Sequence, residues 1–218
     1  MATTVSDLLA VRRWEGGPGA TGSIHLISGP MFSGKTSELT RRLRVARAAK
    51  LECLLVRPPV DTRWGEDDKS EGVLVRTHAA QTLTEADDVT LIRAATLAEA
   101  RKIAKKMGVF RVVGIDEGQF MPDLTKGCEL WAAEGARVIV AALDGTYEQT
   151  EFNSVSSLYP HCEEVVKLVA VCMRCHERWA PFTARKFLKD AGRASKGHID
   201  IGGADKYEAV CRKCLTGV

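Results

Sequence analysis

The chain has 218 residues, of which 45% are hydrophobic and 27% are charged, values typical of a soluble globular protein with one sizeable domain or a domain plus a small module. Its formal net charge of +3 is too small to indicate a nucleic-acid partner, because such proteins usually concentrate Lys and Arg on one face. No apolar run approaches the roughly 20 residues needed to cross a bilayer. The chain has seven cysteines, an odd number, and its N-terminus lacks the apolar core of a signal peptide. Both observations favour a cytoplasmic protein and count against a framework of disulfides.

In chain order, residues 1–22 are interpreted as a flexible tail, because glycine and proline cluster between 16 and 22. After it, nearly continuous apolar runs alternate with stretches of helical periodicity. The predicted strands are 23–28, 51–56, 73–76, 109–117, 137–143 and 163–171. The predicted helices are 37–50, 95–108 and 122–135, and a long polar loop occupies 57–72. Buried strands that alternate with helices favour an α/β fold in which helices cover both faces of a parallel sheet.

The first predicted strand ends in a glycine-rich loop. Gly29, Gly34, Lys35 and Thr36 have the spacing of a phosphate-binding loop. The glycines allow the backbone to approach phosphates, Lys35 supplies a positive charge, and the Thr36 hydroxyl can ligate Mg²⁺. A strand before the loop and an amphipathic helix after it are the context that this motif requires. We therefore predict nucleotide binding rather than a coincidental glycine-rich turn.

Two acidic residues follow the apolar run VVGI within the segment VVGIDEGQF, residues 112–120. Asp116, at the end of an apolar strand, suits a residue that holds Mg²⁺ beside the phosphates. Adjacent residues of a strand point to opposite faces, so Glu117 does not share that task unless the strand end is twisted. Glu117 is a candidate base for the phosphate acceptor, and an exposed acid at a strand end is the alternative.

Four cysteines form two Cys-x-x-Cys pairs, Cys172 with Cys175 and Cys211 with Cys214. Two such pairs suit a tetrahedral zinc site in which four thiolates complete the coordination shell, and such sites are usually structural. Between them, residues 197–210 contain two adjacent glycines and Tyr207. This segment is either an ordinary loop or a loop that lies across a ligand. The other cysteines, Cys53, Cys128 and Cys162, are expected to be small core residues.

Seven segments, in order, resemble the type II thymidine kinases over roughly residues 23–215. They are GPMFSGKT (29–36), DTR (61–63), IDEGQF (115–120), VIVAALDGT (138–146), VVKLVAVCMRC (165–175), IGGADKY (201–207) and CRKC (211–214). The resemblance implies a RecA-like P-loop domain over 23–171 and a small zinc-binding lasso domain over 172–218. It also implies Mg²⁺-dependent transfer of the γ-phosphoryl group of ATP to the 5′-hydroxyl of thymidine. It further implies a homotetramer inhibited by dTTP, and leaves open whether deoxyuridine is accepted.

The resemblance assigns roles to individual residues. Glu117 is the general base, Thr36 and Asp116 hold Mg²⁺, and the four paired cysteines bind the structural Zn²⁺ that anchors the lasso. The residues implied to bind ATP and its phosphates are Gly29, Pro30, Met31, Phe32, Ser33, Gly34, Lys35, Thr36, Asp61, Arg63, Asp116 and Gln119. The residues implied to bind the nucleoside are Met31, Tyr147, Phe152, His198, Ile199, Asp200, Ile201, Gly202 and Tyr207. Tyr147 departs from the phenylalanine of the animal enzymes but keeps an aromatic face.

Two other classes of protein share some of these features. A P-loop ATPase that drives motion or DNA recombination would show a basic DNA-binding surface and would hydrolyse ATP without a nucleoside, and the small net charge counts against it. A zinc-dependent nucleic-acid-binding module would interleave basic and aromatic residues around its cysteines. Arg174, Arg178, Trp179, Arg185 and Lys186 partly meet that description. That alternative leaves the phosphate loop and Glu117 without a purpose.

Overall fold

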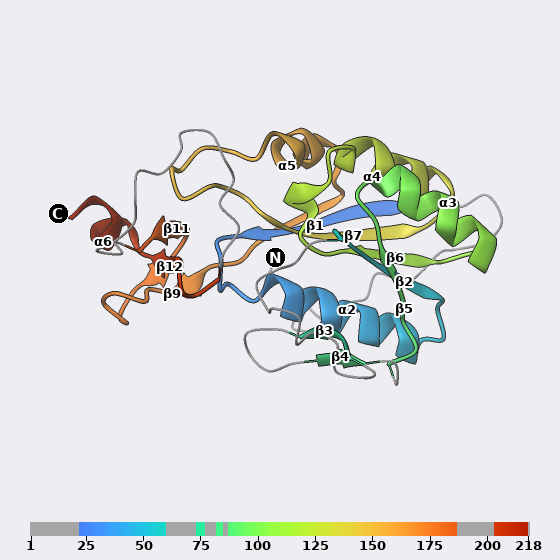
Figure 1. Cartoon of the computed structure of the whole chain (residues 1–218), viewed down its shortest axis with the longest axis horizontal. Coiled ribbons are helices and arrows are strands. Elements are labelled where there is room, and N and C mark those ends of the chain that lie inside the picture. The colour runs from blue at the N-terminus through green and yellow to red at the C-terminus, as the bar shows by residue number, and fades with distance from the viewer. Residues whose placement is uncertain (1–21, 60–72, 77–81, 85–86, 187–202, 218) are drawn as a thin grey trace, which may run out of the picture.

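A computed structural model describes residues 22–59, 73–76, 82–84, 87–186 and 203–217. Its centre is a sheet of six parallel strands in the order β5-β2-β6-β7-β1-β8 (Figure 1). These strands are β1 Ser23–Gly29, β2 Cys53–Arg57, β5 Thr90–Arg93, β6 Val112–Ile115, β7 Arg137–Leu143 and β8 Glu164–Lys167. Because all six run the same way, their carboxyl ends meet at one edge of the sheet, where ligands bind in such folds.

Helices cover both faces of the sheet, as Figure 1 shows. Helix α2 (Lys35–Ala48) lies on one face, and α3 (Leu97–Met107), α4 (Leu124–Ala133) and α5 (Asn153–Leu158) lie on the other. Each face has its own hydrophobic core, because successive strand residues alternate between the two sides. In β1, for example, Leu26 joins the core under α3 to α5, and Ile27 joins the core under α2. The predicted α/β fold with a doubly covered parallel sheet is confirmed. No helix in the described part of the chain has the length and apolar character of a membrane span.

The last predicted strand of the sheet, 163–171, is wrong as one element. Strand β8 ends at Lys167, and Leu168 donates its N–H to the Ser28 carbonyl near the end of β1. Beyond that point β1 gives way to the glycine loop, so the chain leaves the main sheet. Residues Ala170–Val171 form β9, which pairs with β10 (Trp179–Ala180) in a separate small sheet.

Regular structure continues after residue 171, where the sequence pattern indicated none. Strand β11 (Phe182–Arg185) pairs with β12 (Tyr207–Val210), and the short helix α6 (Arg212–Thr216) follows. These elements enclose a small core of their own around the paired cysteines. A hairpin of β3 (Val73–Arg76) and β4 (Thr82–Thr84), and the short helices η3 (Gly118–Phe120) and η4 (Tyr159–His161), complete the described elements. The division of the chain into a tail of residues 1–22, a domain of 23–171 and a domain of 172–218 stays a prediction.

Candidate active site

The glycine-rich loop joins the end of β1 to the start of α2. Gly29 has a φ of +145°, and a Cβ there would lie 2.4 Å from the Leu168 carbonyl oxygen, so this position excludes a side chain. Gly34 caps α2 in the left-handed conformation, with a φ of +85°. No side chain caps this helix end, so its first N–H groups and its positive dipole are available to an anion. The Lys35 ammonium group donates to the Pro30 carbonyl at 2.6 Å, which places its charge within the loop. This geometry fits a triphosphate.

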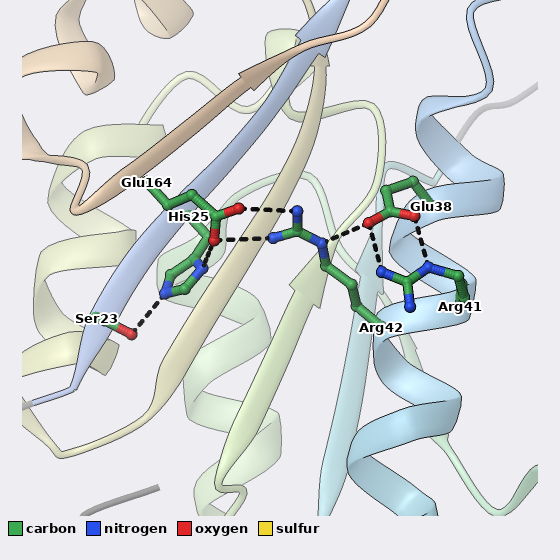
Figure 2. Close-up of polar contacts among 6 residues, drawn as sticks. All are labelled: Ser23, His25, Glu38, Arg41, Arg42 and Glu164. Carbon is green, nitrogen blue, oxygen red and sulfur yellow. Dashed lines mark hydrogen bonds and ion pairs between the residues drawn. The ribbon is translucent and has the colours of Figure 1, made fainter. Parts of the chain in front are cut away.

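A network of charged side chains fastens α2 to the strands beneath it. Figure 2 shows its six residues: Ser23, His25, Glu38, Arg41, Arg42 and Glu164. Arg42 on α2 donates to both Glu164 carboxylate oxygens on β8, at 3.0 and 3.2 Å, and to Glu38 at 2.8 Å. His25 on β1 contacts Glu164 through Nδ1 at 2.5 Å. The network therefore joins β1, β8 and the helix that carries Lys35 and Thr36.

The charge state of this network follows from its surroundings. Burial lowers the pKa of His25, and the nearby Arg137 and Arg42 lower it too, against the opposite effect of Glu164. A neutral imidazole whose Nδ1–H donates to Glu164 accepts a hydrogen bond from the Ser23 hydroxyl at Nε2, 3.0 Å away. Hydrogen bonds from Arg41 lower the pKa of Glu38 to about 2. The anchor of α2 is thus made of ionised acids and arginines beside a neutral histidine.

Asp116 follows β6 directly and is 2% exposed. Its Oδ1 accepts a hydrogen bond from the Thr36 hydroxyl at 3.0 Å, and its Oδ2 lies 3.4 Å from Nε of Arg57, which is 3% exposed. A hydroxyl and a carboxylate oxygen side by side at the start of α2 are the oxygen ligands that Mg²⁺ takes, so these residues fit the metal. Arg57 was not predicted. In the sequence, the only sign of a role for Arg57 is that a charged residue ends the apolar run CLLVR. Asp116 becomes its partner because β2 pairs with β6.

Glu117 is half-buried and adopts a left-handed backbone, with φ 55° and ψ 42°. This conformation costs a residue other than glycine on the order of 1–3 kcal/mol, and such residues cluster at functional sites. It also ends the extended strand after Asp116, so the alternation of a strand no longer governs where the Glu117 side chain points. Gln119, one of the residues expected to bind phosphate, donates from its amide to Glu117 Oε2 at 2.5 Å.

The C-terminal small sheets meet the phosphate loop. The Met31 N–H donates to the Thr183 hydroxyl of β11 at 3.0 Å, and both residues are buried, at 7% and 6% exposure. The rings of Tyr147 and Tyr207 lie 6.0 Å apart and are inclined at 36°. The Arg185 guanidinium lies 5.8 Å from the centre of the Tyr147 ring. The structure therefore brings three of the expected nucleoside-binding residues to this side of the molecule and adds Thr183 and Arg185.

Other expected site residues are elsewhere. Phe152 is buried in the main core at the start of α5, and Phe32 packs against the small core around the cysteines. Seven expected residues lie outside the part of the chain that the structure describes. They are Asp61, Arg63, His198, Ile199, Asp200, Ile201 and Gly202.

The sulfur atoms of the two cysteine pairs gather in one cluster. All four Sγ atoms lie within 4.8 Å of one another, and the Sγ atoms of Cys175 and Cys211 are 3.9 Å apart. Tetrahedral zinc, with Zn–S bonds of about 2.3 Å, requires sulfur separations of about 3.8 Å. Burial raises the pKa of the Cys172 thiol, but backbone N–H groups, led by that of Cys175, lower it to about 6. The donor set therefore fits a structural Zn²⁺. Of the other cysteines, Cys53 and Cys128 are buried and Cys162 is half-buried.

Comparison with known proteins places these features in one family. The family model described as thymidine kinase matches residues 22–215. The thymidine kinase of Vaccinia virus (strain Ankara) is 41% identical over 196 residues, which span 90% of this chain and 98% of the relative. The cytosolic thymidine kinase of Bos taurus is 42% identical over 200 residues, or 91% of this chain and 74% of the relative. A solved structure of flagellar accessory protein FlaH from Methanocaldococcus jannaschii matches with a TM-score of 0.46 and 11% identity, over 71% of this chain and 74% of the other. The phosphate loop, the acids beside it and the cysteine cluster thus lie in a chain that belongs to the thymidine kinase family.

Proposed function

We propose that this enzyme transfers the γ-phosphoryl group of ATP to the 5′-hydroxyl of thymidine and so forms thymidine monophosphate, a salvage reaction that supplies DNA synthesis. One observation carries the proposal. In a chain of this family, the phosphate loop, the Thr36–Asp116 pair and a strained Glu117 meet at the carboxyl edge of the sheet. Transfer of this kind needs little covalent chemistry from the protein, so positioning and charge stabilisation account for most of the rate.

Residues 29–36 hold the triphosphate in this proposal, through the loop N–H groups and the uncapped start of α2. The Lys35 ammonium group exchanges the Pro30 carbonyl for phosphate oxygens. Thr36 and Asp116 would hold Mg²⁺, which when bound neutralises the charge of the phosphates. Asp61 and Arg63, outside the described residues, are proposed to lie near the reacting phosphates.

Glu117 acts as the general base. Its carboxylate takes the proton of the 5′-hydroxyl as that oxygen bonds to the γ-phosphorus, and the bond from the γ-phosphorus to the bridging oxygen breaks, so that ADP leaves. General-base catalysis of this kind is typically worth about 10²–10⁴-fold. Its left-handed backbone and its hydrogen bond from Gln119 support a side chain held for one task rather than an incidental surface acid.

The nucleoside lies between the loop and the C-terminal sheets. Met31, Tyr147 and Tyr207 flank the base, and Phe152, which lies in the main core, is proposed to be near it. Backbone groups of residues 198–202 read the thymine edge, and Zn²⁺ on the four cysteines holds the segment that carries them. A pocket sized for one ring rejects purine nucleosides, and the same assay with deoxyuridine decides whether the methyl group of thymine is required.

Regulation and assembly are also proposed, from the resemblance to the family. We propose that dTTP inhibits the enzyme by binding with its triphosphate on the loop, and that the enzyme is a cytoplasmic homotetramer. Strand β8 supports the oligomer, because it is an edge strand of the described sheet and its Val165 is 36% exposed. Light scattering of the purified protein tests the tetramer, and inhibition of thymidine phosphorylation by dTTP tests the feedback.

The decisive experiment mixes the protein with MgATP and each deoxynucleoside in turn and identifies the products. Thymidine should give thymidine monophosphate and ADP in equal amounts. Glu117→Gln should lower turnover by about 10²–10⁴-fold and leave ATP affinity unchanged, because Glu117 does not hold phosphate. Hydrolysis of ATP at full rate without any nucleoside would instead favour the P-loop ATPase alternative.

A further inference from the structure

Gln119 is buried beside Glu117 and makes hydrogen bonds to three residues, one on β7, one on α5 and Glu117 itself. Its side-chain oxygen accepts the N–H of Leu143, the last residue of β7, at 3.0 Å. Its side-chain nitrogen donates to Glu117 Oε2 at 2.5 Å. Its backbone carbonyl accepts a hydrogen bond from the Ser154 hydroxyl of α5 at 3.3 Å. The residue therefore links the sheet and α5 to the acid that is proposed to act as base.

The orientation of the Gln119 amide is determined by its two partners. A backbone N–H can only donate, so the atom that faces Leu143 has to be the amide oxygen. The amide nitrogen then faces Glu117, and an ionised carboxylate can only accept. The two requirements agree, so the amide nitrogen of Gln119 is the donor and the Glu117 carboxylate is the acceptor.

The backbone groups around the Gln119–Glu117 hydrogen bond are fixed by the sheet and by the short helix η3. Leu143 is paired with Gly29 in the sheet, so the N–H that holds Gln119 belongs to the strand next to the one that leads into the phosphate loop. The short helix η3 is closed by the N–H groups of Phe120 and Met121, which donate to the carbonyls of Glu117 and Gly118. A glutamate carboxylate has three rotatable bonds, and a fixed donor at one oxygen restricts all of them.

We infer that Gln119 is a positioning residue, which holds the Glu117 carboxylate in the direction from which it accepts the proton of the 5′-hydroxyl. This inference rests on the proposed role of Glu117. This role toward the base is additional to the predicted phosphate contact, because the amide nitrogen carries two N–H groups and the bond to Glu117 uses one of them. Misplacement of a reacting group by about 1 Å can cost on the order of 100-fold in rate.

The test is a double-mutant cycle on turnover. Gln119→Met keeps the length of the side chain but neither accepts from Leu143 nor donates to Glu117. We expect kcat to fall by about 10- to 100-fold, with the KM values for ATP and thymidine within about two-fold of wild type. In a Glu117→Gln background, the same change should lower kcat by no more than about three-fold, because the group that Gln119 positions is already gone. Ser154→Ala, which removes only the contact to the Gln119 backbone, is the matched control and should leave kcat within about two-fold.

A second variant covers the case in which Gln119→Met folds poorly. Gln119→Glu can still accept the Leu143 N–H, but it presents an acceptor to Glu117 instead of a donor, and it should lose kcat to a similar extent. Full additivity of the two changes in the cycle, or wild-type kcat for Gln119→Glu, would overturn the inference and leave Glu117 as the base. Wild-type turnover of Glu117→Gln alone would instead overturn the proposed base itself, so the two failures can be told apart.

Discussion

Replacing Thr183 with valine tests whether the C-terminal sheets hold the phosphate loop. Valine nearly conserves the shape of threonine but removes the oxygen that accepts the Met31 N–H at 3.0 Å. Because both residues are buried, water does not replace that acceptor. A buried donor left without its acceptor costs about 1–3 kcal/mol, so we expect the free energy of unfolding in urea to fall by that amount. We also expect the KM for ATP to rise, since Met31 belongs to the loop.

Thr183→Ser is the matched control. Serine keeps the hydroxyl and loses one buried methyl group, which is worth about 0.8 kcal/mol of burial, so it should destabilise less than valine and leave the KM for ATP unchanged. Both variants are measured with zinc bound and at one protein concentration, because metal and assembly contribute to the measured stability. A valine variant within about 0.5 kcal/mol of wild type, or a serine variant less stable than valine, would show that this hydrogen bond does not hold the loop.

Three further predictions follow from the rest of the structure. Cys172→Ser should remove the single zinc per chain found by elemental analysis and weaken nucleoside binding more than ATP binding; fully active protein without zinc would contradict this. His25 has a pKa lowered below its ordinary 6.5, so its contribution to stability is complete above about pH 6.5 and is lost as pH falls through the folded-state pKa. His25→Gln should remove this contribution from the pH dependence of the unfolding free energy, measured by urea unfolding. An unchanged pH dependence would refute it. Arg57→Met leaves the buried Asp116 carboxylate without this counter-ion and should lower the unfolding free energy by about 3–5 kcal/mol. Adding Asp116→Asn should restore part of that loss. Equal stability of the wild type and the two variants would exclude a stabilising ion pair.

Local patterns in the sequence predicted most of the main sheet. Strand β7 has the bounds of the predicted strand 137–143, and Gly108 ends α3 as its position indicated. Both follow from short-range physics, since a buried parallel strand is a continuous apolar run and glycine is a common helix terminator. The phosphate loop was predicted for the same reason, because its spacing is contained within eight residues.

Contacts between distant segments could not be predicted in this way. Thr183 is 152 residues from Met31, and Glu164 is 139 residues from His25, so neither pair leaves a periodic signal. Strands β10 to β12 are two to four residues long and lie among polar residues, and their pairing depends on the closure of the small core around the cysteines. The left-handed backbone of Glu117 was also invisible, because nothing in the segment IDEGQF marks a break directly after Asp116.

The phosphate loop is held from two sides, and only one of the two anchors involves the core around the cysteines that are proposed to bind zinc. Its helix side is fixed by the network of Arg42, Glu164 and His25, which lies entirely on β1, β8 and α2. Its other side depends on the Met31–Thr183 hydrogen bond and on Phe32, which packs against the core that the cysteines close. Tyr207, by contrast, lies on β12 directly before the second cysteine pair. If the four cysteines bind zinc as proposed, its loss would remove one of two supports from the phosphate loop but would displace Tyr207 directly. We therefore expect thymidine affinity to fall further than ATP affinity.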